Sequence, residues 1–516
     1  MSNNQILLQK QNLNSNINAA SLEKPNTPKQ ELMSKLKLGA VIGIILLYLS
    51  CYSGTWVPGF DSSQYLDIAE NIAQGKGPTS CGKTYTTLSP ATTWFYAGII
   101  KVFGYNFFLF NAINLAISML AIYATWKMLL IWFKPNIAFW STALFAINSQ
   151  YIKLSYMIQT DVQFMLVFSL CIIAFHKLLT TGKIYYYFLA AFLAMLSILV
   201  RLPGIIILAP ALLAMLCDKY DDPKANKRRK IILFAGISAA LVGIIIVVAS
   251  PKILGIYLTH FKSLGLSISN YEYWVKKFTK LQSSYARMIY DQNSPIVLFF
   301  LMIPILVGIF KSWKNGQRFM LMFPLVCTLA FIAIMARPRY MVQIVPFFAA
   351  MLIIGSFTIA NKFKNIHAKR FFAIIFIFLF AGFNLPRAIK RVYTRHLPKQ
   401  TLEAKLCKGF VKKGKLFNTI IPKKSICLFA GERIHLLAFT MKDHEFVKID
   451  TPKADAILQH PPADRNVYII YSPAKEDMSS KSKVIFQKLL KENKYSKIFT
   501  TKDKILVIYK HNKPIS

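Results

Sequence analysis

The chain has 516 residues, of which 54% are hydrophobic and 14% aromatic, and its mean hydropathy is +0.41. This composition excludes an ordinary soluble globular protein, and repeated apolar runs of spanning length predict an all-α polytopic membrane protein. The chain has 63 Lys and Arg against 22 Asp and Glu, which gives a net charge of +41. In a membrane protein, this excess is typical of basic loops that face the cytoplasm and anionic lipid. We therefore expect membrane lipids as partners, and no nucleic acid.

Residues 1–37 are polar and rich in Asn, Gln and Lys, which predicts a disordered cytoplasmic tail. The first apolar run comes late and has no clear small-residue cleavage site, so we interpret it as an uncleaved first span. The first outer loop then covers 54–106. It contains the amphipathic segment Pro90–Phe103, which is short enough either to cross or to lie on the surface.

The transmembrane domain is predicted to extend over 38–386, with about eleven spans and a polar loop at 251–294. The predicted spans are Leu38–Ser53, Phe107–Phe133, Asn136–Gln150, Asp161–Leu179, Tyr185–Val200, Pro203–Leu216, Ile231–Ser250, Pro295–Phe310, Phe319–Ala336, Tyr340–Ala360 and Phe371–Pro386.

Three basic loops, at 219–230, 311–318 and 362–370, decide the predicted orientation, because Lys and Arg are enriched in cytoplasmic loops. All three lie inside, together with the N-terminus, only if Pro90–Phe103 stays on the outer surface. The segment after the last span conflicts with this topology, because Arg387, Lys390 and Arg391 make it basic although it falls outside.

The C-terminal part, 387–516, is predicted to be a small soluble α/β domain on the outer side. The segments 423–431, 465–472 and 503–510 have the pattern of short strands, and 479–494 has that of an amphipathic helix. Cys407 and Cys427 could form a disulfide if this part is exported, and the sequence leaves that open.

The predicted topology brings several charged side chains to the outer ends of the spans. Each also has a structural interpretation: a solvated loop acid, a helix N-cap, a snorkelling anchor, a headgroup contact or an aromatic-belt residue. Asp67 and Glu70 are expected to be solvated. The candidates are, in chain order, Asp61, Tyr65, Asp161, Arg201, Arg337 and Arg339.

Five segments in this order resemble motifs of one family: the GT-C-fold, polyprenyl-phosphate-dependent membrane glycosyltransferases, in particular the protein O-mannosyltransferase and lipid A aminoarabinose transferase group. Two departures are that Asp61 is followed by Ser62 where the family often has Asp-Glu, and that its Pro-Pro is Ser89-Pro90 here. The segments are Gly59–Ala69, Ser89–Gly104, Thr160-Asp161, Leu193–Gly204 and Arg337–Pro346.

The resemblance implies a GT-C-like helical domain that transfers a sugar from a polyprenyl-phosphate donor to a lipid, glycan or protein acceptor on the outer face. A carboxylate can take the acceptor's proton, and Asp61 is our candidate. Arg201, Arg337 and Arg339 are candidates for the donor phosphate, with Asp161 and Tyr65 in support. A sugar phosphate already carries a good leaving group, so no metal is required. A divalent cation held by Asp61 and Asp161 stays open.

Three other functions stay open. A transporter or flippase of a lipid-linked sugar would have similar hydropathy, but we see no internal repeat of the transporter kind. A surface-polysaccharide polymerase or ligase, or an inactive scaffold, would also fit the hydropathy. The expected location is a bacterial inner membrane, with the C-terminal domain periplasmic or extracellular.

Overall fold

The structure is a computed structural model. It describes residues 28–53, 60–80, 83–84, 89–201, 205–218, 223–232, 271–290, 294–333 and 338–396 of the helical part. In the C-terminal part it describes 416–417, 419–430, 444–449, 452–459, 462, 464–471, 485–489, 495–500 and 507–512. The chain divides into two compact units at Leu49 and Ser50.

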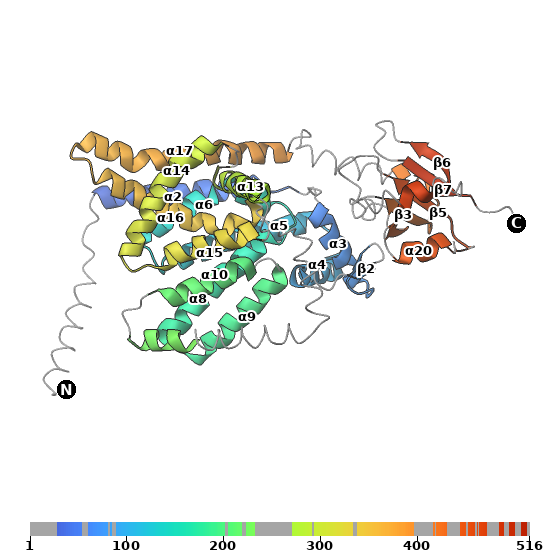
Figure 1. Cartoon of the computed structure of the whole chain (residues 1–516), viewed down its shortest axis with the longest axis horizontal. Coiled ribbons are helices and arrows are strands. Elements are labelled where there is room, and N and C mark those ends of the chain that lie inside the picture. Colours follow the sequence, from blue (N-terminus) through green and yellow to red (C-terminus); the bar gives the residue numbers. More distant parts are fainter. Residues whose placement is uncertain are drawn as a thin grey trace. The chain divides into compact units, whose positions relative to one another are not determined.

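Helices dominate the part of the chain before residue 400 (Figure 1). They are α2 (Pro28–Leu49), α3 (Phe60–Ala73), α4 (Pro90–Phe103), α5 (Phe107–Leu129), α6 (Pro135–Ala146), α7 (Ser149–Ser155), α8 (Asp161–Thr181), α9 (Ile184–Val200), α10 (Ile205–Cys217), α13 (Tyr271–Tyr290), α14 (Pro295–Lys314), α15 (Phe319–Ala333), the 3₁₀ helix η2 (Pro338–Ile344), α16 (Val345–Ala360) and α17 (Ile366–His396). A two-stranded ribbon, β1 (Thr79–Ser80) and β2 (Lys83–Thr84), follows α3.

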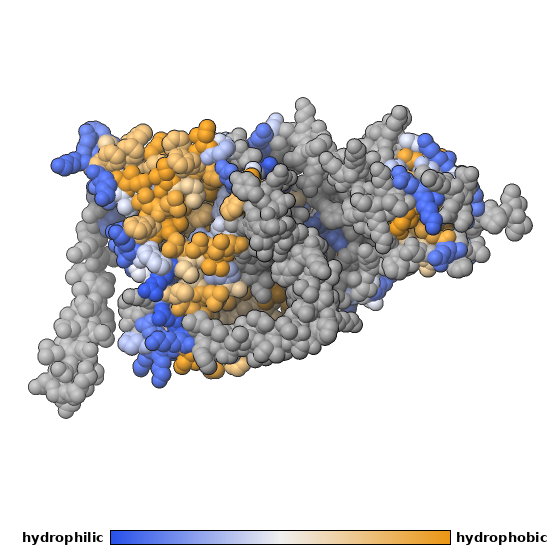
Figure 2. Space-filling model, in the orientation of Figure 1, coloured by the Kyte–Doolittle hydropathy of each residue, from blue (hydrophilic) through white to orange (hydrophobic). Residues whose placement is uncertain are grey.

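Six segments of the described chain are long and apolar enough to cross a membrane, and three shorter helices are also apolar. Their outward side chains include Phe299, Phe310 and Phe378, each at least 60% exposed, as expected for a surface that lipid covers. Figure 2 shows hydrophobic residues gathered over these helices and hydrophilic residues at their ends. The predicted polytopic helical class is therefore confirmed. The predicted span Ile231–Ser250 lies outside the described residues.

Several predicted boundaries differ from the structure. Helix α2 begins at Pro28, so residues 28–37 of the predicted tail are helical. The predicted polar loop at 251–294 contains the amphipathic helix α13. Helix α17 continues past the predicted domain boundary at 386 to His396, with Pro386 inside it. A helix can have a polar face where water surrounds it, so hydropathy alone did not identify α13 and ended α17 too early.

The predicted span Asn136–Gln150 is interrupted by a buried polar residue. Asn148 ends the apolar helix α6 and caps α7, because its Oδ1 accepts a hydrogen bond from the Tyr151 backbone N–H at 3.1 Å. Its Nδ2 donates to the Met288 carbonyl oxygen of α13 at 2.9 Å and to Asn384 Oδ1 of α17 at 3.2 Å. One asparagine thereby ties α7 to two helices from the second half of the chain.

Helices α14 and α16 pack closely because glycine faces backbone at two points. A Cβ atom at Gly308 would collide with the Met351 carbonyl group, and one at Gly355 would collide with the Pro304 carbonyl group. Small residues let transmembrane helix backbones approach in this way. This contact fixes α16, which directly continues η2.

The C-terminal part has a five-stranded mixed sheet in the order β4-β3-β5-β7-β6. The strands are β3 (Ile426–Ala430), β4 (Glu445–Lys448), β5 (Val467–Tyr471), β6 (Tyr495–Thr500) and β7 (Val507–His511), and helix α20 covers Pro452–Gln459. Strands β4, β3 and β5 are parallel, and β7 pairs antiparallel with β5 and β6. Three of these strands match the predicted ones, whereas β4, β6 and α20 were not predicted. Cys427 is buried in β3 and Cys407 lies outside the described residues, so their disulfide stays a prediction.

Candidate functional site

Asp61 lies in the first turn of α3, where a carboxylate is favoured by the helix dipole. The rest of α3 packs on α4 through a buried cluster that includes Leu66, Ala69, Tyr96 and Ala97. Helices α3 and α4 therefore form one unit, and this unit holds the start of α3 in place. Helix α4 packs on α3, and the predicted position of Pro90–Phe103 outside the spans stays a prediction.

Asp161 and Arg201 form an ion pair at the ends of two packed helices. Asp161 is the first residue of α8, as predicted, and Arg201 is the extended residue that ends α9. Asp161 is 3% exposed and Arg201 is 5% exposed. Because two charges are buried together here, the loss of either would leave the other without compensation.

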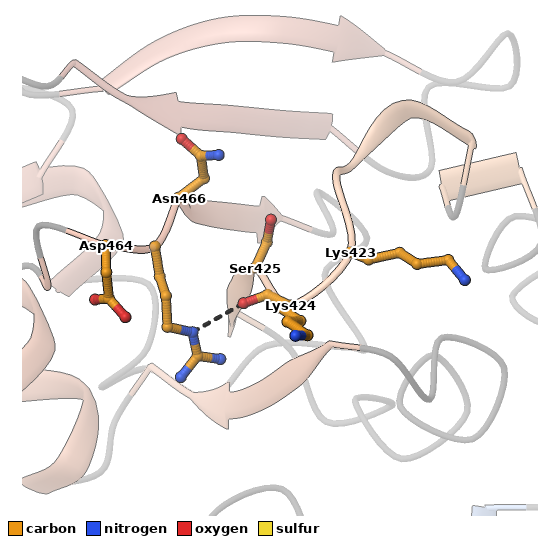
Figure 3. A pocket seen from close by; sticks show the side chains of 6 residues that line it. Lys423, Lys424, Ser425, Asp464 and Asn466 are labelled. Carbon is orange, nitrogen blue, oxygen red and sulfur yellow. Dashed lines mark hydrogen bonds between the residues drawn. The ribbon is translucent and has the colours of Figure 1, made fainter.

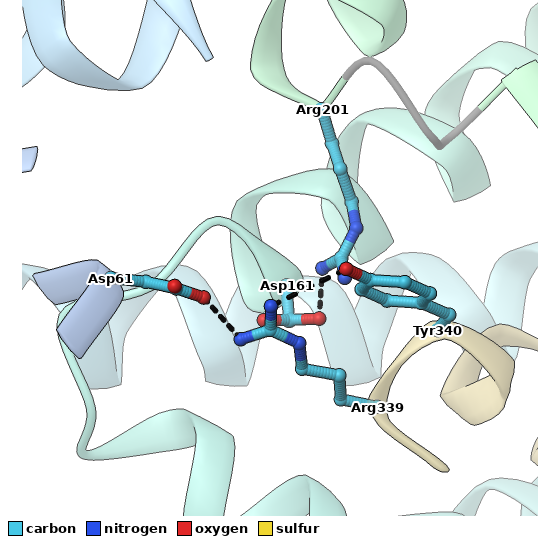
Figure 4. Close-up of polar contacts among 5 residues, drawn as sticks. All are labelled: Asp61, Asp161, Arg201, Arg339 and Tyr340. Carbon is cyan, nitrogen blue, oxygen red and sulfur yellow. Dashed lines mark hydrogen bonds and ion pairs between the residues drawn. The ribbon is translucent and has the colours of Figure 1, made fainter. Parts of the chain in front are cut away.

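A second ion pair joins Asp61 to Arg339, which lies in η2. Each of these two side chains is 27% exposed, so this pair is open to solvent where the first is not. The site thus has one buried pair and one accessible pair (Figure 4). A ligand that arrives from solvent would therefore meet Asp61 and Arg339 before the buried pair.

The aromatic ring of Tyr340 connects the two pairs (Figure 4). The guanidinium carbon of Arg201 lies 4.5 Å from the ring centroid, and that of Arg339 lies 5.2 Å from it. Arg339 Nη2 also donates a hydrogen bond to the Tyr340 hydroxyl at 3.4 Å. An aromatic face attracts a cation, so one ring restrains both guanidinium groups.

Tyr65 lies one helical turn after Asp61 and is 7% exposed. Its pKa is raised above the ordinary value of 10.0, first by burial and then by the negative charge of Asp61, while a hydrogen bond with Ser89 lowers it. Ser89 precedes α4 and has φ of 42°, a left-handed conformation that is uncommon for a serine. The Tyr65 hydroxyl is therefore a neutral donor near Asp61 at ordinary pH.

The structure brings together most of the predicted site residues. Asp61, Tyr65, Asp161, Arg201 and Arg339 gather at one place, as the contacts above show. Arg337 lies outside the described residues, so its predicted role remains a prediction.

The sequence analysis did not identify Tyr340 as a site residue, and it predicted the wrong environment for Asp67. Tyr340 was quoted only as part of a motif, although its position next to Arg339 was a usable signal. Asp67, expected to be solvated, is half-buried and accepts a hydrogen bond from Ser80. This bond attaches β1 to α3, so Asp67 has a structural contact and lies apart from the two pairs.

The carboxylates of the site do not fit a divalent cation. Within the described ranges, no group of three or more His, Cys, Asp and Glu side chains lies close enough to hold a metal. Asp61 and Asp161 are each ion-paired to an arginine. A cation between them would have to displace both guanidinium groups, so we derive no catalytic step through a metal.

Comparisons with known proteins agree with this architecture. A family model described as dolichyl-phosphate-mannose-protein mannosyltransferase matches residues 87–254. The crystal structure of ArnT from Cupriavidus metallidurans in the apo state has a TM-score of 0.55 and 11% identity, covering 93% of this chain and 98% of that chain. The apo oligosaccharyltransferase of Archaeoglobus fulgidus has a TM-score of 0.57 and 12% identity, covering 92% of this chain and 74% of that chain.

No curated protein sequence matches the chain. At these identities, the structural matches show the fold, which is the GT-C fold of membrane glycosyltransferases. The predicted resemblance is confirmed at the level of this fold and of the matching segment.

Proposed function

We propose that this chain is a membrane glycosyltransferase that moves one sugar from a polyprenyl-phosphate donor to an acceptor hydroxyl or amine on the outer face. The observation that carries the proposal is the double pair, Asp61–Arg339 and Asp161–Arg201, joined by Tyr340. Its members come from α3, α8, η2 and the end of α9. Charges at membrane depth are expensive, so such a cluster favours a site that binds a charged group.

The accessible pair has an unused donor that suits a phosphate. The Nε–H group of Arg339 is buried and has no hydrogen-bond partner among the described residues. A guanidinium matches the oxygens of a phosphate in a planar, two-point fashion. The donor phosphate would therefore bind Arg339 through Nε and a terminal nitrogen, and thereby compete with Asp61 for this side chain.

That competition gives Asp61 its role in the reaction. When the donor phosphate takes over Arg339, the Asp61 carboxylate is released beside the anomeric carbon. The acceptor oxygen or nitrogen then attacks that carbon, and its proton passes to Asp61. The bond between the anomeric carbon and the phosphate oxygen breaks, and its electron pair leaves with the polyprenyl phosphate. Arg339 stabilises the charge that develops on this leaving group.

The buried pair has a different task. Asp161 is nearly inaccessible, so it holds Arg201 in place and leaves acceptor activation to Asp61. Arg201 in turn lies against the Tyr340 ring, and Arg339 contacts the same ring. The apolar helix surfaces nearby would accommodate the polyprenyl tail, because its isoprene units are as apolar as lipid chains.

We place the reaction on the outer face of a plasma membrane, where the C-terminal domain would also lie. The support is the excess of Lys and Arg in the three loops at 219–230, 311–318 and 362–370, together with the position of the ion-paired site residues at or next to helix ends. The sugar could be a hexose or a pentose. The polyprenyl-phosphate donor and the lipid, glycan or protein acceptor are likewise part of the proposal.

Purified full-length protein in nanodiscs, supplied with radiolabelled polyprenyl-phosphate sugars and membrane extract as acceptor, tests the proposal. We expect label to leave the lipid with the parent protein. Asp61→Asn should slow transfer by roughly 100-fold or more, as for the loss of a general base. Glu70→Gln, on the same helix, is the matched control and should transfer normally. Loss of label from one leaflet without cleavage of the sugar would instead indicate a flippase.

Arg339→Lys tests the phosphate role separately. Lysine keeps the positive charge but lacks the planar, two-point donor geometry with which a guanidinium binds a phosphate. Transfer should fall by roughly 10- to 100-fold, the effect of about one lost charge-assisted hydrogen bond. Arg287→Lys on α13, which is exposed, is the control. Equal rates for both variants would contradict the assignment of the donor phosphate to Arg339.

A further inference from the structure

The C-terminal sheet carries a cavity that takes no part in the proposed reaction site. Its volume is about 540 Å³, and two loops that precede β3 and β5 line it (Figure 3). These strands are parallel neighbours, with Ile426 opposite Val467, so the residues just before each strand lie side by side. The lining residues are Lys423, Lys424, Ser425, Asp464, Arg465 and Asn466.

Arg465 is held in a fixed position at this cavity. Its Nε–H donates to the Lys424 carbonyl oxygen at 2.8 Å, as Figure 3 shows, and its Nη1 lies 2.6 Å from Glu445 Oε2. Glu445 begins β4, so the guanidinium is braced from two neighbouring strands. These contacts use two of its five N–H groups, which leaves the others available to a ligand. A braced arginine loses little entropy when it binds an anion.

Lys424 adopts a strained backbone conformation at the same place. Its φ is 63°, and Ser89 is the other described non-glycine residue with a positive φ. Such a conformation costs on the order of 1 kcal/mol or more for a residue with a side chain, and it concentrates at ligand sites. Here the Lys424 carbonyl oxygen accepts the hydrogen bond from Arg465, and the Lys424 side chain lines the same cavity as the guanidinium.

The lining restricts the chemistry of a ligand. All six side chains are polar or charged, with three cations and one carboxylate. Among the described residues, this lining includes neither an aromatic side chain that could stack on a nucleotide base nor an apolar side chain that could hold a lipid tail. Carboxylate, amide and ammonium groups instead suit a ligand with several hydroxyl groups and a negative charge. The volume is within the usual range for small-molecule sites.

We propose that this cavity binds a saccharide that carries a carboxylate or a phosphate. Arg465 and Lys424 contact the anionic group, and Asp464 and Asn466 hydrogen-bond to the sugar hydroxyls. The assignment does not depend on the transfer reaction, because it concerns equilibrium binding to the C-terminal domain.

Ligand-observed NMR on the full chain in detergent micelles tests the proposal with glucuronate, glucose 6-phosphate, glucose and inorganic phosphate. We expect saturation transfer to glucuronate and to glucose 6-phosphate, and at least tenfold weaker binding of glucose and of inorganic phosphate. Lys424→Asn removes the charge, and asparagine tolerates the left-handed backbone, so the fold is kept. This variant should bind glucuronate about tenfold more weakly, which corresponds to the loss of roughly one charge-assisted contact.

Lys497→Asn is the matched control, because Lys497 is an exposed lysine on β6 of the same sheet. It should leave glucuronate binding unchanged. The proposal is overturned if glucose binds as tightly as glucuronate, if inorganic phosphate binds as tightly as glucose 6-phosphate, if neither anionic sugar binds, or if the two lysine variants lose affinity equally. These binding measurements do not depend on whether the parent protein transfers a sugar, so the two proposals are tested separately.

Discussion

Asp61 and Arg339 form an ion pair across 278 positions of sequence, and both side chains remain partly exposed. The pair joins α3 to the segment just before α16, so it links an early segment of the helical part to one in its second half. Asp161 and Arg201 form the equivalent contact only 40 positions apart and are almost fully buried. Because Asp61 is accessible and Asp161 is buried, we assign acceptor activation to Asp61 and the positioning of Arg201 to Asp161. The predictions below test these roles and the packing around the site.

Tyr340 should act through its ring more than through its hydroxyl. Tyr340→Phe keeps the ring that Arg201 and Arg339 contact and removes one hydrogen bond, so transfer should fall only a few-fold. Tyr340→Leu removes the face as well and should cost roughly tenfold more in kcat. Steady-state kinetics of both variants check this order, and a Phe variant as slow as the Leu variant would show that the hydroxyl matters most.

The buried pair should dominate the stability of the site. Asp161→Asn leaves the Arg201 charge without a partner and should destabilise the protein by about 3–5 kcal/mol. Adding Arg201→Gln removes that charge, so the double variant should unfold at a higher temperature than the single variant, while transfer stays impaired. Thermal unfolding in detergent measures both variants.

The matched control for this pair is Glu31→Gln. It breaks the exposed pair of Glu31 with Lys35, whose side chains are 58% and 72% exposed, and it should change the unfolding temperature little. If the single and double variants at Asp161 and Arg201 unfolded at the same temperature, the buried charge would not be the source of the instability.

The close packing of α14 on α16 should depend on the absence of a side chain at Gly355. Gly355→Ala places a Cβ against the Pro304 carbonyl group, so it should destabilise the protein by about 1–3 kcal/mol. It should also reduce transfer, because α16 continues directly from η2 and its arginine. Gly382→Ala on α17 meets nothing within 4 Å and is the matched control. Thermal unfolding and detergent resistance distinguish the two variants. If Gly355→Ala were as stable as Gly382→Ala, the contact with the Pro304 carbonyl group would not limit the packing.

Asp218 should give the stability a pH dependence that is separate from the site. Its carboxylate accepts hydrogen bonds from the Trp132 indole N–H and the Phe319 backbone N–H, both at 2.7 Å. Burial nevertheless raises its pKa above the usual 3.8. Below the unfolded pKa, the folded and unfolded states both bind the proton, and the contribution to stability is complete. As the pH rises toward and through the raised folded pKa, the unfolded state releases its proton first and the contribution is lost.

Asp218→Asn removes this titration and provides the reference. The stability of the parent protein relative to this variant should therefore fall as the pH rises from about 4 to neutral. Unfolding temperatures of both proteins measured across this range check the sign. A difference that is constant with pH, or that grows toward neutral pH, would contradict a raised pKa at Asp218.

Much of the fold could be predicted because it follows from the length and hydropathy of single segments. Apolar runs such as Phe107–Leu129 and Asp161–Thr181 have the length and hydropathy of a span whatever their neighbours are. Short, nearly continuous apolar runs likewise indicated β3, β5 and β7. Helix α13 was missed because its polar face lowers its hydropathy below that of a span, and Asn148 was missed because a single polar residue does not interrupt an apolar average.

The sequence by itself determined the membrane class, the helical domain followed by a small α/β domain, and the set of acids and arginines from which the site is drawn. It did so because hydropathy, charge and motif order are properties of neighbouring residues. Only the tertiary structure decided that Asp61 pairs with Arg339 and Asp161 with Arg201, that Tyr340 lies between the arginines, and that one pair is buried and the other open. Those relations depend on how helices distant in sequence pack together, and the packing is fixed by many contacts at once and not by any single segment.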